Sequence, residues 1–391
     1  MRRWVVAALL AALLPACTPT GDDRPKVPAA RAADLAALAE ALAAHPDPPD
    51  ISDDVEELRD RAAEVSDERW LVELMRLTAG RDRDGHTGVF PLAQPALELW
   101  PLQLYDFDDG WRVVAALPPY DEIVGGRVDA VGDVPVEQAA QALADLVPRD
   151  NDQTVRARVA QLLVAPAVLR GAGLRESITV DGTVVEPEPI PAPDFAEWSD
   201  AFYPLVVPRL PPVPDSALAV ARQGDALVLT YAQVVAASGD TTLRDLAAAV
   251  SSGDVRRVVV DLRHNSGGEN GSYPPLLAAL QDLPAGTVRL LTSRTTFSAA
   301  TNFVAEVLSS TDALLVGEPM GGAPNMWGDA REVVLPGTGV VVHVATRLWE
   351  LGGVDLRSTV PVDVQVPVTW ADWSAGRDPA HERALVGEGG A

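Results

Sequence analysis

The residue of this sequence best placed to do chemistry is Ser298, at the predicted start of a helix. A strand at 288–291 leads into the turn Thr295-Thr296-Phe297, and the helix is predicted to open at Ser298 with Thr296 as its N-cap. Unpaired backbone N–H groups and the positive end of the helix dipole would stabilise an oxyanion formed there. A serine at a helix start is usually only a cap, so the interpretation depends on the rest of the chain. The apolar residues of this helix recur on one face: Ala300, Phe303, Val304, Val307 and Leu308.

A pair of glycines, Gly267-Gly268, follows a second predicted strand. The run 258–262 is short, β-branched and apolar on both faces, which is typical of a strand buried in a parallel sheet. Because glycine has no Cβ, the backbone after this strand can bring its N–H groups close to a ligand, as an oxyanion pocket requires. A glycine pair can equally do no more than end a strand. The significance of the pair therefore comes from the wider pattern that contains it.

Three motifs together resemble the tail-specific (C-terminal processing) serine peptidase family. They are Asp-Leu-Arg-x-Asn-x-Gly-Gly at 261–268, Thr-x-Ser-Ala-Ala at 296–300 and Val-Gly-Glu-Pro-x-Gly-Gly at 316–322. The combination is far more specific than any one motif. The similarity covers roughly residues 70–390 and is greater to the tricorn-core-like and retinoid-binding-protein-like branch. It implies an α/β fold with a crotonase-like (ClpP-like) βαβ spiral core, and Ser298 as the nucleophile.

The general base of such an enzyme must here be a histidine. In the bacterial processing branch a lysine after the serine activates it, but the only lysine of this chain is Lys26, in the leader, so a Ser-Lys dyad is excluded. The resemblance assigns the base to His86, in a charged, glycine-flanked loop at 80–88, because members of this branch carry an Asp-Gly-His-Thr-like segment there. His264, beside the glycine pair, is the serious rival.

The remaining three histidines are weaker candidates for the base. His343 alternates within an apolar strand and is more readily explained as a strand residue than as a catalytic one. His45 and His381 lie in helical or terminal segments that we expect at the surface.

Two carboxylates are candidates for the acid that orients the base. Tricorn-like members of the family place a glutamate after the last core strands, and the nearest matches here are Glu350 and Asp355. Each can equally be read as a surface carboxylate. The oxyanion hole is expected from the backbone N–H groups of Gly268 and Ala299, next to Gly267. The predicted reaction needs neither a metal nor a cofactor.

The start of the chain resembles a bacterial lipoprotein signal. A basic start, Met1-Arg2-Arg3, precedes an apolar run at 4–14 that is too short to span a membrane, and the run ends at Leu14-Pro15-Ala16-Cys17. We therefore expect a signal peptide over 1–16, lipidation of Cys17, the only cysteine, and a polar tether over 17–33. This predicts an exported protein of the bacterial cell envelope, lipid-anchored on the outer face of a membrane.

The charge balance limits the possible partners. The chain holds 56 Asp and Glu against 31 Lys and Arg, a formal net charge of −25. Such a balance argues against nucleic acid and against an electrostatic hold on anionic lipid, so the membrane contact should be the lipid anchor alone. The expected partner is a peptide or an unfolded protein.

The predicted domain order follows from the same patterns. A helical cap over 34–90 carries His86, and a PDZ-like, β-rich domain is predicted over 91–186, because 125–136 resembles the PDZ strand that precedes its second helix. A proline-rich connector over 187–215 leads into the peptidase core over 216–391, where strands alternate with helices.

Two other functions are compatible with this fold. One is a non-catalytic ligand- or peptide-binding envelope lipoprotein, since relatives in the retinoid-binding branch hold ligands and a fold does not fix a function. The other is a crotonase-type acyl-thioester enzyme that binds coenzyme A, a cofactor scarce where the export signal would place the chain. The sequence favours a serine peptidase with an acyl-enzyme on Ser298.

Overall fold

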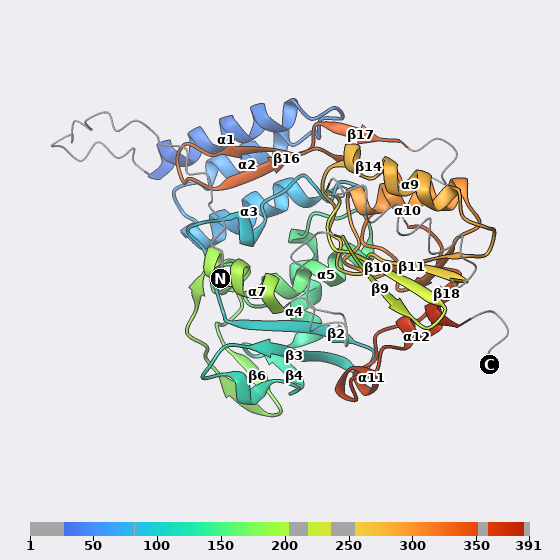
Figure 1. The fold of residues 1–391 in the computed structure, drawn as a ribbon. Helices are drawn as coiled ribbons and strands as arrows, with labels where there is room; N and C mark the ends of the chain where they lie inside the picture. Colours follow the sequence, from blue (N-terminus) through green and yellow to red (C-terminus); the bar gives the residue numbers. More distant parts are fainter. Residues whose placement is uncertain (1–26, 82, 203–217, 236–254, 351–358, 387–391) are drawn as a thin grey trace, which may run out of the picture.

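The computed structural model describes residues 27–81, 83–202, 218–235, 255–350 and 359–386 (Figure 1). The predicted leader with Cys17, the candidate acid Asp355 and a helix predicted at 243–250 lie outside these residues. The chain is a mixed α/β protein, as the sequence predicts. None of the described helices is long and apolar enough to cross a membrane.

Three helices form the N-terminal part, and the first begins at Val27, inside the predicted tether over 17–33 and before the predicted cap. They are α1 (Val27–Ala43), α2 (Ser52–Asp60) and α3 (Asp67–Ala79). The side chain of Ser66 caps α3 by accepting a hydrogen bond from the Arg69 N–H, the ordinary use of a serine at a helix start. The loop that carries His86 begins directly after α3.

The region between the first helices and the core mixes short strands with helices. Its elements are β1 (Glu98–Leu99), β2 (Leu102–Phe107), β3 (Gly110–Ala116), β4 (Val128–Val131), β5 (Val134–Pro135), α4 (Val136–Leu143), α5 (Asp152–Leu162), α6 (Pro166–Gly171), β6 (Ile178–Val180), β7 (Thr183–Val185) and β8 (Ile190–Pro191). Strands β2 and β3 pair with each other, β1 pairs with β8, and the others form a sheet in the order β5-β4-β6-β7.

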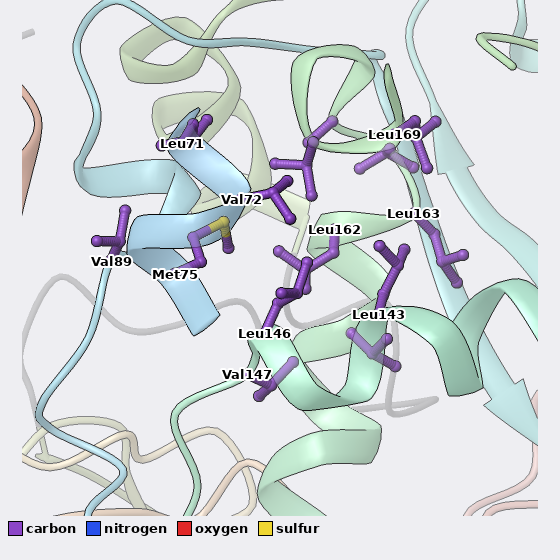
Figure 2. Packing of buried hydrophobic residues seen from close by; sticks show 14 of the residues in the cluster. Leu71, Val72, Met75, Val89, Leu143, Leu146, Val147, Leu162, Leu163 and Leu169 are labelled. Carbon is purple, nitrogen blue, oxygen red and sulfur yellow. The ribbon is translucent and has the colours of Figure 1, made fainter. Parts of the chain in front are cut away.

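The helical part and this middle region share one hydrophobic core. Figure 2 shows Val72 and Met75 of α3 facing Leu146 and Leu162, which come from the segment after α4 and from α5. Because the residues before and after the His86 loop belong to the same packed cluster, that loop is tied to a rigid support.

The proline-rich segment at 187–215 contains a helix. Residues Ala192–Phe202 form α7, whose Phe195 and Trp198 pack into the same core. The predicted connector thus includes a helix that packs into the core, and 203–217 lie outside the described residues. Proline is tolerated here because it falls in the first turn of the helix, where an N–H has no helical partner.

A six-stranded sheet forms the C-terminal half, in the order β18-β13-β12-β11-β10-β9. Its strands are β9 (Leu218–Gln223), β10 (Ala226–Tyr231), β11 (Arg257–Asp261), β12 (Val288–Thr292), β13 (Leu314–Gly317) and β18 (Val364–Gln365). All neighbouring pairs are parallel except β9 with β10. The carboxyl ends of β10 to β13 therefore meet at one edge, where ligand sites of parallel sheets commonly lie.

Helices cover both faces of this sheet. On one face α9 (Pro274–Gln281) and α10 (Ala299–Ser310) pack on Val258 and Val260, and on the other α12 (Pro379–Leu385) packs on Val259 (Figure 1). This alternation confirms the prediction of a strand that is apolar on both faces.

Two hairpins and one short helix complete the described chain. The hairpins pair β14 (Met326–Gly328) with β17 (Arg347–Trp349) and β15 (Arg331–Val334) with β16 (Val341–Val344), and α11 is Trp370–Ser374. In Figure 1, β16 runs alongside α1. The hairpins thus carry residues of the core half back to the N-terminal helices, beside the His86 loop.

Candidate active site

The structure brings His86 and Ser298 into direct contact. The Nε2 atom of His86 lies 2.9 Å from the Oγ atom of Ser298, although the two residues are 212 positions apart in the chain. This is the distance expected between a nucleophile and its general base. Both residues are largely buried but keep some exposed surface.

Ser298 occupies the N-cap position of α10 in an unusual conformation. Its φ of 54° and ψ of −129° place a non-glycine residue in a region that L-residues rarely adopt. Its side chain caps no backbone N–H, which leaves Oγ to His86. The helix begins one residue later than predicted, and Thr296 is not its cap, because the Thr296 hydroxyl donates to the Leu262 carbonyl at 2.9 Å instead. A strained backbone at this position is typical of a functional site.

The glycine pair lies directly against the nucleophile. Gly267 and Gly268 have φ values of 116° and 141°, and a Cβ on Gly267 would lie 2.6 Å from the Cβ of Ser298. A Cβ on Gly268 would lie 2.1 Å from the Val234 carbonyl oxygen. Only glycine can therefore adopt this backbone conformation at the two positions. The sequence predicts the glycine turn but not its contact with Ser298.

Two N–H groups are available for an oxyanion. Among the described residues, no acceptor is found for the N–H of Gly268 or of Ala299. The N–H of Gly267 donates to Asn265 Oδ1 at 3.0 Å and so already has an acceptor, unlike the other two. The role of Gly267 is to leave room beside Ser298 and Ala299.

The loop around His86 is fixed by hydrogen bonds to three separate segments, at 149–150, 327 and 343–345. The Asp150 carboxylate accepts the N–H of Gly85 at 2.7 Å and that of Ala323 at 3.0 Å. The other bonds run from Trp327 N–H to the Arg83 carbonyl, from Asp84 N–H to the Arg149 carbonyl, from Ala345 N–H to the Thr87 hydroxyl, and between Gly88 and His343 in both directions. The base is therefore held by the fold and not by its own side chain alone.

The environment of His86 keeps its imidazole neutral. Burial, followed by the charge of Arg158, lowers the pKa of His86 from 6.5 to about 3; a contribution from His343 acts in the same direction, and the backbone of Trp327 opposes it. A neutral imidazole is the form that can accept the serine proton. No side chain of the described residues hydrogen-bonds to the Nδ1 atom, and the group that influences His86 from the backbone is Trp327.

This low pKa predicts activity far into the acid range. His86 accepts a proton only when neutral, so activity is retained above its pKa and lost as the pH falls through it. The rate of reaction with a fluorophosphonate probe should thus be nearly constant from pH 8 to pH 5 and fall only as the pH approaches about 3. A fall in the labelling rate near pH 6.5, the ordinary pKa of histidine, would contradict the lowered pKa of His86.

Neither predicted acid meets His86 in the described part of the chain. Glu350 directly follows β17 and is exposed, with no hydrogen bond or ion pair to His86, and Asp355 lies outside the described residues. The end of β17 nevertheless approaches the site, since a Cβ on Gly328 would lie 3.0 Å from Trp349 and 4.0 Å from the His86 ring. The acid assignment stays a prediction.

The structure separates the other histidines from the nucleophile. His264, the rival base, lines a cavity of about 110 Å³ beside Thr295, and His86 holds the position next to Oγ. His343 lies in β16 and pairs through its backbone with Gly88, so it supports the base loop. His381 contacts Gln223 at 2.9 Å.

His45 is buried, whereas the sequence predicts it at the surface. It is 2% exposed, its ring packs on Trp327, and its Nε2 lies 3.2 Å from the buried Asp84 carboxylate. The other Asp84 oxygen accepts the Thr87 N–H at 3.0 Å. His45 therefore contacts the His86 loop through Asp84, and no periodicity in the sequence could reveal this contact, because it joins segments that are far apart in the chain.

Asp150 is a second residue that sequence reasoning missed. Burial raises the pKa of its carboxyl to about 7, against the lowering effect of two backbone N–H groups and of Arg158. The folded state therefore holds a proton that the unfolded chain releases near pH 4, and the stability this provides is lost as the pH rises toward 7.

Replacing Asp150 by asparagine tests this account. Asparagine does not titrate and offers only one acceptor oxygen, so one of the two backbone N–H groups loses its partner, at a cost of about 1–3 kcal/mol. In denaturant unfolding at pH 5 and pH 8, the wild type should lose more stability between the two values than Asp150→Asn does. Equal losses would show that Asp150 does not titrate in this range.

Comparisons with known proteins show the fold. No protein-family model and no curated protein sequence matches the chain. A crystal structure of a CPAF mutant is 14% identical, with 91% of this chain and 96% of that chain covered and a TM-score of 0.62. The chain has the fold of CPAF.

A second CPAF structure matches the chain equally well, and a related processing protease matches it less well. Mature CPAF complexed with lactacystin is 13% identical, with 92% of this chain and 97% of that chain covered and a TM-score of 0.61. The photosystem II D1 C-terminal processing protease also matches, at 14% identity, 86% of this chain, 93% of that chain and a TM-score of 0.40. Function has to be argued from the site itself.

Proposed function

We propose that this chain is a serine peptidase of the tail-specific family, in the branch that uses a histidine base. The observation that carries the proposal is the 2.9 Å contact between His86 Nε2 and Ser298 Oγ, beside two backbone N–H groups without an acceptor among the described residues. A nucleophile, a neutral base and oxyanion donors are the parts that acyl transfer requires.

The reaction follows from these positions. Ser298 Oγ attacks the carbonyl carbon of a peptide bond while its proton passes to His86 Nε2. The N–H groups of Gly268 and Ala299 stabilise the negative charge on the carbonyl oxygen. His86 then gives the proton to the leaving amine, and a water activated by the same imidazole releases the acyl group from Ser298.

The finer predictions about fold and location belong to the same proposal. The parallel sheet with helices on both faces would be the crotonase-like spiral, and the region of β2 to β7 would be the PDZ-like domain. Cys17 would anchor the protein to the outer face of a bacterial membrane. Its substrates would then be peptides or unfolded proteins of the envelope.

A binding protein without catalysis is the second candidate function. It is favoured by one observation: within the described part of the chain no carboxylate reaches Nδ1 of His86. A histidine without a carboxylate partner lacks the group that stabilises its charged form during acyl transfer.

Incubation of the full-length protein with a mixture of unfolded proteins and peptides separates the two candidates. A peptidase produces new termini, which mass spectrometry identifies, without added metal or cofactor. Peptides that are retained on the immobilised protein but remain uncut would support the binding protein and contradict the proposal.

A further inference from the structure

The side chain of Arg158 lies between the two loops that carry the candidate catalytic residues. It projects from α5, and its Nη1 donates to the Gly85 carbonyl at 2.6 Å and to the Pro148 carbonyl at 2.8 Å. Gly85 directly precedes His86. Since Asp150 binds the N–H of the same glycine, Gly85 is held on both sides, by a carboxylate and by a guanidinium.

The same guanidinium also packs on the nucleophile loop. Its central carbon lies 4.5 Å from the centroid of the Phe297 ring, and Phe297 directly precedes Ser298. The Phe297 ring in turn stacks on His86, with ring centroids 4.7 Å apart and planes at 27°. The Phe297 ring thus lies in contact with both Arg158 and His86, and its own backbone leads directly into Ser298, the partner of His86 in the 2.9 Å contact.

The space around this set is fully used. A Cβ on Gly85 would lie 2.7 Å from the Phe297 ring, so the two loops touch with no room for a side chain. The Phe297 N–H donates to the Asn265 carbonyl at 3.1 Å, which fixes the ring from its backbone. A shift of Arg158 would therefore move His86 relative to Ser298.

We propose that Arg158 is a positioning residue that holds His86 against Ser298. The inference rests on the proposed function and names a residue that acts through Gly85 and Phe297 without touching the substrate. Arginine suits this role because its planar group can donate to carbonyls in its plane while its face packs on an aromatic ring. Lysine carries the charge but has neither the fork nor the flat face.

The charge of Arg158 has a second effect that can be measured separately. Together with burial and His343 it lowers the pKa of His86, while the Trp327 backbone raises it. The other titratable groups in this cluster are Asp150, whose pKa the charge of Arg158 lowers, and Asp84, which raises it. Removing the Arg158 charge should therefore raise the pKa of His86, which a purely structural role would not do.

The test measures the rate constant for labelling of Ser298 by a fluorophosphonate probe, as a function of pH, in the full-length protein. We expect Arg158→Gln to lower the rate roughly 100-fold, as a misplaced catalytic group commonly does, and to move the acidic limb to higher pH. Arg158→Lys should lower the rate while the limb stays in place. Arg156→Gln is the matched control, since Arg156 lies on the same helix and contacts Asp106 instead.

The outcomes distinguish this inference from the proposed function. A wild type that takes no label contradicts both. The inference alone is overturned if the wild type is labelled and Arg158→Gln is labelled at the same rate as Arg156→Gln. The acidic limb of the pH profile would then also be the same in both variants. If Arg158→Gln does not fold by circular dichroism, Arg158→Lys decides: a slower rate with an unmoved limb supports the inference, and an unchanged rate overturns it.

Discussion

Replacement of His86 by alanine is expected to lower the rate of acyl transfer at Ser298 by about 10⁴- to 10⁶-fold, the loss typical of removing one member of a catalytic pair. The reason is the 2.9 Å contact, through which Nε2 takes the proton from Oγ. The effect is measured as kcat/KM on a peptide that the wild type cleaves, or as the labelling rate where no peptide is yet known.

A matched variant shows whether the loss is specific. His264→Ala removes the rival base, which lines a cavity away from Oγ, and should change the rate far less than His86→Ala does. If His264→Ala abolishes the reaction and His86→Ala does not, the base has been assigned to the wrong histidine. Both variants need a normal unfolding transition, since both side chains pack against the loops of the site.

Replacement of Gly267 by alanine is the second change with a large expected effect. The new Cβ would lie 2.6 Å from the Cβ of Ser298 and 3.1 Å from the Ala299 nitrogen, at a φ of 116° that alanine rarely adopts. The nucleophile and one oxyanion donor must both shift. Loss of oxyanion geometry alone costs about 10²- to 10³-fold in kcat, so the combined loss should be at least that large.

Gly286→Ala provides the control for backbone strain. Gly286 has a φ of 76°, but a Cβ there meets no atom within 4 Å. This variant should lose some stability through strain and keep its activity. Equal loss of activity in Gly267→Ala and Gly286→Ala would mean that the collision with Ser298 is not the cause.

The sequence predicted the parts of this site that lie in continuous motifs. The strand before Gly267, the helix after Ser298 and the buried sheet each follow from hydrophobic periodicity, and the structure confirms all three. The choice of His86 came from resemblance to a family, and the structure places that residue next to Ser298.

The residues that the sequence could not reveal act through long-range contacts. Arg158 is 73 positions from Gly85 and Asp150 is 65, and each occupies an otherwise ordinary surface-like pattern. The sequence around His45 predicts a surface residue, because it carries no information on Asp84, whose carboxylate lies 3.2 Å from His45 Nε2. The positive φ of Ser298 is likewise not encoded by any local propensity.

The measurement that tests the central claim most directly is covalent labelling of the full-length protein with a fluorophosphonate probe, mapped by mass spectrometry. We predict that Ser298 takes the label and that Ser66, an ordinary cap serine whose side chain accepts the Arg69 N–H, does not. Labelling of Ser298 should disappear in His86→Ala. An unlabelled Ser298 in the folded wild type, or one that His86→Ala labels at the wild-type rate, would contradict the claim that these two residues form a catalytic pair.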